Sequence, residues 1–104
     1  MDAFPTDALD LTFVGALIHW RGPSPFHFVT MPEGAAAEVK DISPLVTYGW
    51  GVVPATVTIG ASTWPTALFP KDGGYLVPVK DMYRTAEHLE VGDTVSVRLT
   101  IAPR

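Results

Sequence analysis

Residues 62–80, STWPTALFPKDGGYLVPVK, combine residues typical of strands with residues that interrupt them. The stretch is rich in the aromatic and β-branched residues that strands favour, yet it holds three prolines. Proline has no backbone N–H to donate to a neighbouring strand, so prolines belong at strand ends, bulges or edges. Asp72-Gly73 is the core of a tight turn between two apolar runs. The stretch therefore predicts two short strands, with Pro65 and Pro78 where a strand is interrupted or ends.

The rest of the chain repeats this pattern of short strands and Gly/Pro turns. The clearest strand is the last, in which Val95, Val97, Leu99 and Ile101 alternate with polar residues. The strands are predicted at residues 9–20, 26–31, 52–60, 62–69, 75–79 and 94–101. Six short strands indicate a small barrel or sandwich, and the prolines favour a split barrel with interrupted edges.

Two short helices are predicted between the strands. The first begins at Pro32 and should end before Pro44, because proline interrupts helical hydrogen bonding. The second spans residues 80–89, with Met82, Ala86 and Leu89 on one face and Gly92 as the glycine that stops it. The expected fold is therefore mainly β: a small barrel or sandwich of six short strands with two short helices, in which the prolines favour a split barrel.

Length and charge narrow the classes of function. The 104 residues suit one domain, expected at residues 9–104 after a flexible lead-in at 1–8. The formal net charge of -4 disfavours binding to nucleic acid or to an anionic membrane. The chain has no cysteine, no signal-like N-terminus and no long apolar run, so a soluble cytoplasmic protein without disulfides is expected.

An ordered set of short motifs resembles the bacterial DUF1905 family. The set covers about residues 9–101 and contains Trp64, Thr66-Ala67-Leu68, Gly74-Tyr75, Val77-Pro78-Val79, Arg84-Thr85-Ala86 and Gly92-Asp93-Thr94-Val95. The resemblance implies a split β pseudobarrel, similar to the swapped-hairpin barrels of transition-state regulators and antitoxin DNA-binding proteins. The family has no established activity, so the resemblance assigns no catalytic residue.

The chain is rich in aromatic residues, and most of them are expected to pack in the core. Trp50 lies between two glycines in a loop, which suggests a lid or a partner contact. Arg84 or Lys80 offers a charge for a ligand, and the alternatives for Arg84 are to cap backbone carbonyls or to pair with Asp81 or Glu87. The candidate ligand-binding residues are Trp50, Trp64, Arg84, His27 and Tyr83.

The three histidines do not form a metal-binding pattern, and no metal or cofactor is expected. His88 is predicted to lie on the surface of the second helix. His19 and His27 fall on adjacent strands and could approach each other, which makes them the best candidates for acid–base chemistry. No nucleophile or phosphate-loop motif is present.

Three functional hypotheses follow. The leading one is a non-catalytic module that binds a small ligand or a protein partner through an aromatic-lined pocket. The second is a small enzyme that uses His19 or His27 with Arg84 and Tyr83, if these side chains share one cavity. The third is a dimeric DNA-binding barrel, which rests on fold analogy alone. Formation of a homodimer is left open.

Overall fold

The computed structural model describes residues 8–20, 26–46 and 52–102. The predicted turn at residues 21–25 and the loop that holds Trp50 lie outside the described residues. So does the predicted lead-in, apart from Ala8, whose N–H donates to the carbonyl of Ile101 (2.6 Å). The elements, in chain order, are β1 (Leu9–Trp20), β2 (Phe26–Thr30), α1 (Glu33–Val46), β3 (Val53–Ile59), β4 (Ser62–Lys71), β5 (Gly74–Val79), α2 (Asp81–Ala86) and β6 (Thr94–Ile101).

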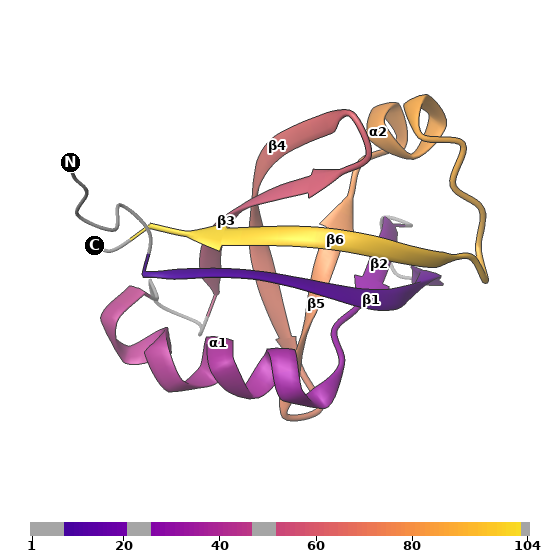
Figure 1. Cartoon of the computed structure of the whole chain (residues 1–104). Coiled ribbons are helices and arrows are strands. Elements are labelled where there is room, and N and C mark those ends of the chain that lie inside the picture. The colour runs from indigo at the N-terminus through magenta and orange to yellow at the C-terminus, as the bar shows by residue number, and fades with distance from the viewer. Residues whose placement is uncertain (1–7, 21–25, 47–51, 103–104) are drawn as a thin grey trace, which may run out of the picture.

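The six described strands close into an antiparallel barrel in the order β1-β2-β5-β4-β3-β6 (Figure 1). Two long strands exchange partners part-way along. β1 pairs with β6 through Ala16 and with β2 from Leu17 onward. β4 pairs with β3 through Leu68 and with β5 from Phe69 onward. The barrel is thus two sheets that share β1 and β4, which confirms the prediction of a six-stranded, mainly β barrel with short helices.

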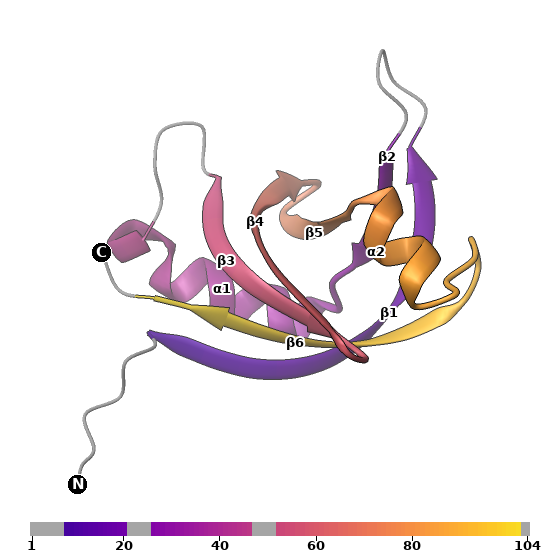
Figure 2. The same ribbon diagram turned by 90° about the horizontal axis from the view of Figure 1, so that it is seen from above.

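The two helices lie at different parts of the barrel: α1 along one side and α2 at one end (Figures 1 and 2). α1 packs against β1, β3 and β5 and inserts the buried side chains of Ala36 and Val39 into the core. α2 stands near the end of the barrel where β1 finishes.

The prolines of the strands mark incomplete edges. Pro54 lies in β3 outside the part paired with β6, and Pro65 lies in β4 outside the part paired with β5. Pro70 pairs only towards β5, and Pro78 only towards β2. Each proline therefore has a ladder neighbour on one side only, as expected for a residue that cannot donate. The structure corrects one detail, because β4 runs through Pro65 without a break.

The core forms where the inner faces of the strands meet. The predicted alternation in β6 is confirmed, since Val95, Val97, Leu99 and Ile101 are all buried. Trp64 is the largest fully buried side chain and contributes a single large ring to this core. Alternation accounts for the buried side chains of β3 and β6, whereas β5 buries the three consecutive residues Tyr75, Leu76 and Val77.

The structure corrects the end of α1. The helix continues through Pro44 to Val46 instead of ending before the proline. In a helix, the missing N–H of Pro44 would leave the carbonyl of Lys40 without its usual donor. Here the Ser43 hydroxyl donates to that carbonyl at 2.9 Å. This side-chain hydrogen bond replaces the lost backbone bond.

The structure also corrects α2, which ends at Ala86 and is shorter than predicted. The chain leaves it through a Schellman motif, in which the N–H groups of His88 and Leu89 donate to the carbonyls of Thr85 and Arg84. His88, rather than Gly92, takes the left-handed position that ends the helix (φ 55°). Tyr83 and Leu89 pack against the core, whereas Met82 is 65% exposed. Of the three residues placed on one helical face, Leu89 therefore contacts the core, whereas Met82 and Ala86 are exposed.

Candidate functional site

Two of the predicted site residues form a stack where α2 meets the barrel. The Trp64 ring projects from β4 and lies against the Tyr83 ring of α2, with ring centroids 4.3 Å apart and planes 9° from parallel. Trp64 is 1% exposed, and its Nε1 has no hydrogen-bond acceptor among the described residues. The stack joins α2 to the core.

Two further predicted residues lie in a polar cluster beside α2. His27 is paired with His19 across β1 and β2, and the two imidazole rings are 4.8 Å apart. His27 Nδ1 is 3.5 Å from Asp81 Oδ1. Arg84 Nε donates to the same Oδ1 at 3.2 Å, and Arg84 Nη1 donates to the Leu89 carbonyl at 3.4 Å. Asp81 therefore links His27 of β2 to Arg84 of α2. It is one of the two acidic partners predicted for Arg84.

The electrostatics of this cluster keep His27 neutral. Burial lowers the pKa of His27, and the nearby charges of Arg84 and His19 lower it further, against the opposing effect of Asp81. Because the imidazole is neutral at neutral pH, its 3.5 Å contact with Asp81 is not a full ion pair. The protonated form is the one that folding disfavours.

This shift predicts a dependence of stability on pH. The unfolded chain takes up a proton at His27 near the ordinary value of 6.5, whereas the folded chain does so only at lower pH. The free energy of unfolding should therefore decrease as the pH falls below about 6.5. His27→Gln should show a smaller decrease, measured by denaturant unfolding at several pH values. His88→Asn, on the exposed turn after α2, is the control and should keep the wild-type profile; identical profiles for all three proteins would contradict the assignment.

A third contact holds α2, and sequence reasoning missed it. The Ser62 hydroxyl donates to Glu87 Oε2 at 2.6 Å, and the Ala61 N–H donates to Glu87 Oε1 at 3.4 Å. Gly60 has a φ of 58°, and a Cβ at this position would overlap the Glu87 carboxylate. The turn between β3 and β4 thus requires glycine both for its backbone conformation and for the close approach of Glu87.

His27, Trp64, Tyr83 and Arg84 therefore gather around α2, while Trp50 lies outside the described residues. The side chains of the four are occupied by one another, by Asp81 or by a backbone carbonyl. This arrangement accounts for how α2 is held on the barrel. Their predicted role in binding a ligand, and the acid–base role of His27, stay predictions.

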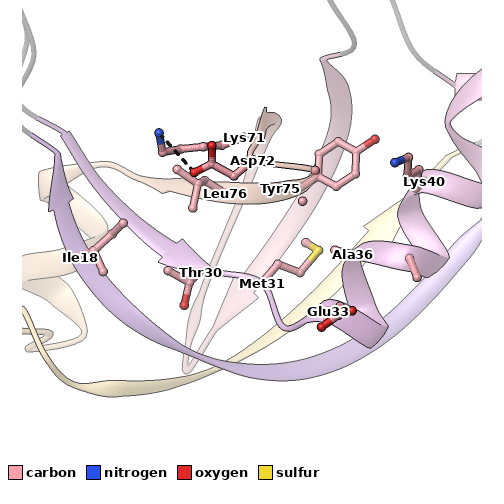
Figure 3. Close-up of a pocket in the computed structure, with 13 residues that line it drawn as sticks. Ile18, Thr30, Met31, Glu33, Ala36, Lys40, Lys71, Asp72, Tyr75 and Leu76 are labelled. Atoms are coloured by element: carbon pink, nitrogen blue, oxygen red, sulfur yellow. Dashed lines mark ion pairs between the residues drawn. The ribbon is translucent and has the colours of Figure 1, made fainter.

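A separate hollow lies on the outside of the barrel, between α1 and the turn that joins β4 to β5 (Figure 3). Its volume is about 660 Å³. We call it the α1 groove. One wall is α1 (Glu33, Ala36, Ala37 and Lys40), the other is residues 71–76, and Ile18, Thr30 and Met31 lie between them.

Exposed aromatic rings adjoin the α1 groove. Lys71 lines the groove, and its Nζ lies 4.1 Å from the centroid of the Trp20 ring. Phe69 packs edge-on against Phe28, with ring centroids 6.2 Å apart. Trp20 is 39% exposed and Phe69 49% exposed. Phe69 pairs with Leu76, which lines the groove, and Lys71 contacts Trp20, so both exposed rings border the groove.

The sequence matches a known protein family over most of its length. Residues 13–99 match the family described as Domain of unknown function (DUF1905). The chain belongs to the DUF1905 family. No curated protein and no solved structure gives a significant match. Membership of DUF1905 confirms the family resemblance, and the description of the family assigns no activity.

Sequence reasoning did not find the α1 groove of this DUF1905 chain. None of the candidate residues His27, Trp64, Tyr83 and Arg84 lines it. Its walls come from α1 and from the β4–β5 turn, which are separated in the chain by β3 and β4. No local motif marks such a pairing, because neither wall has an unusual sequence by itself.

The described part of this DUF1905 chain contains neither a cluster of metal-binding side chains nor a helix that could span a membrane. There, no three histidine, cysteine, aspartate or glutamate side chains gather closely enough to hold a metal ion. The described helices include none with the length and apolar character needed to cross a membrane.

Proposed function

We propose that this DUF1905 chain is a non-catalytic protein-binding module whose binding surface is the α1 groove. The observation that carries the proposal is that the exposed rings of Trp20 and Phe69 border the groove. Contiguous exposed apolar surface with a polar rim is typical of protein interaction sites. Exposed tryptophan at such a surface is typical of residues that dominate binding energy.

The form of the groove favours a protein segment over a small molecule. Sites for small molecules bury most of the ligand surface. Here the walls include exposed residues on both sides, among them Ala37, Lys40, Asp72 and Gly73. A helix or an extended segment can lie along such an open groove and still bury its apolar face. The small-ligand hypothesis at α2 has less support, because the side chains there are partners of one another.

The charges of the groove also bear on the DNA-binding hypothesis. Its rim carries two bases, Lys40 and Lys71, and two acids, Glu33 and Asp72. Lys71 Nζ lies 3.7 Å from Asp72 Oδ2, so part of the positive charge is already compensated. A surface for nucleic acid needs a surplus of Lys and Arg. The balance of charge in this groove fits a protein partner better.

The proposal is tested with peptides selected by the folded protein from a phage-displayed random library. Ala37→Arg places a long charged side chain in the groove and should weaken binding of the selected peptides by about tenfold or more. Glu38→Arg adds the same side chain to the next position of α1, which does not line the groove, and should leave the affinity nearly unchanged. Equal binding to wild type and Ala37→Arg would overturn the proposal.

A further inference from the structure

The groove-facing side of α1 has a distinctive order of residues. Glu33 lies in the first turn, Ala36 and Ala37 follow, and Lys40 lies one turn further. Residues three, four and seven apart share a helix face, so these four form one stripe: acid, two small residues, base. In Figure 3, Glu33 and Lys40 lie at opposite ends of the α1 segment that borders the groove, with Ala36 between them.

The two charges at the ends of the stripe have no ion-pair partner within the described ranges of the chain. They cannot pair with each other, because seven residues at about 1.5 Å each place them about 10 Å apart along the helix axis. Lys71, on the opposite wall, contrasts with them because it already contacts Asp72 and the Trp20 ring. The α1 wall therefore presents an unmatched acid and an unmatched base at a fixed spacing.

When two copies of the stripe lie antiparallel, the acid of each copy faces the base of the other. We propose that the partner in the α1 groove is a second copy of this chain, whose α1 packs antiparallel to the first; the proposal rests on the protein-binding function above. A two-fold axis near Ala36 and Ala37 places Glu33 opposite Lys40 of the partner subunit, and Lys40 opposite Glu33 of the partner subunit. Such an interface is isologous, as in most homodimers.

The other features of the stripe agree with this arrangement. The small side chain of Ala37, which is exposed in the single chain, allows two helix backbones to approach closely at the crossing point, whereas Ala36 beside it is buried against the barrel. A parallel arrangement would place Glu33 against Glu33 of the partner subunit and the two lysines against each other. The charges thus set the orientation, while the apolar groove and the neighbouring aromatic rings supply the buried area.

The test is the oligomeric state of the full chain by sedimentation equilibrium across a range of concentrations. The wild type should approach twice the chain mass of 11.2 kDa as its concentration rises. Glu33→Lys and Lys40→Glu each create two like-charge contacts in the dimer, and each should raise the dissociation constant by about tenfold or more. The double variant E33K/K40E restores opposite charges and should dimerise nearly as well as the wild type.

The swap isolates the contact between subunits, because the two positions are too far apart to interact within one helix. Glu38→Lys makes the same change of charge outside the stripe and should leave dimerisation nearly unchanged. Circular dichroism of every variant controls for folding. A wild type that stays monomeric, single variants that dimerise normally, or a double variant that fails to recover would each overturn the inference. If the selected peptides still bind at the groove in that case, the protein-binding proposal stands; if they also fail, both are wrong.

Discussion

Gly15→Ala is expected to lower the free energy of unfolding by about 3 kcal/mol or more, the upper range for an overpacked interior site. A Cβ built on Gly15 overlaps the carbonyl oxygen of Thr30, and it also lies 3.0 Å from Val29 Cγ1. The Ala16 N–H donates to the Thr30 hydroxyl at 3.1 Å, which fixes the same approach. The obstacle is backbone at the point where β1 changes its partner from β6 to β2, so no side chain can rotate away.

Gly34→Ala is the matched control for this substitution. Gly34 lies in the first turn of α1, and nothing lies within 4 Å of a Cβ built there. Alanine is the better helix former, so the free energy of unfolding should stay unchanged or rise by as much as about 1 kcal/mol. Urea unfolding followed by far-UV circular dichroism measures both variants. Equal stability of Gly15→Ala and the wild type would show that β1 and β2 do not approach as described.

Trp64→Ala is expected to lower the free energy of unfolding by about 4 kcal/mol, the middle of the range for a buried large aromatic residue. Trp64 is 1% exposed, and its ring both fills the barrel interior and supports Tyr83 on α2. Removing the ring leaves a cavity and frees α2 from its stacking contact. Far-UV circular dichroism in urea gives the loss of stability, and hydrogen exchange should show faster exchange of the amides of α2.

Trp64→Phe keeps the measurement informative if the alanine variant does not fold. Phenylalanine retains a ring for Tyr83 and removes the Nε1 donor, which has no acceptor among the described residues. Its cost should be less than half that of alanine, because the loss of packing is partly offset by removal of an unpaired donor. Trp20→Phe, at a 39% exposed ring, should change the stability by no more than about 0.5 kcal/mol. A Trp64→Phe variant as unstable as Trp64→Ala would contradict this account.

The fold was largely predictable from local patterns. The alternation from Val95 to Ile101, the turn at Asp72-Gly73 and the spacing of the prolines each depend on a few neighbouring residues. The errors arose where a contact outside the local pattern decided the outcome. Ser43 supplies the hydrogen bond that lets α1 pass through Pro44, and the stack of Tyr83 on Trp64 selects the buried face of α2.

The candidate site was less predictable. His27, Trp64, Tyr83 and Arg84 do gather in one region, but as partners of one another and of Asp81. The sequence predicted the pairing of Arg84 with Asp81 and the approach of His19 to His27, but it did not predict the stack of Trp64 on Tyr83. The α1 groove was not predicted, because its two walls come together only when the barrel closes.

Local patterns in the sequence were sufficient to predict six strands, the inward face of β6, the turn at Asp72-Gly73 and membership of the DUF1905 family. These follow from interactions between residues close in the chain, where side-chain period and turn chemistry act directly. Three features became visible only in the folded chain: the exchange of strand partners along β1 and β4, the need for glycine beside Thr30, and the groove between α1 and the β4–β5 turn. Each of these features depends on which distant segments pack together when the barrel closes. Local patterns in the sequence do not predict that packing.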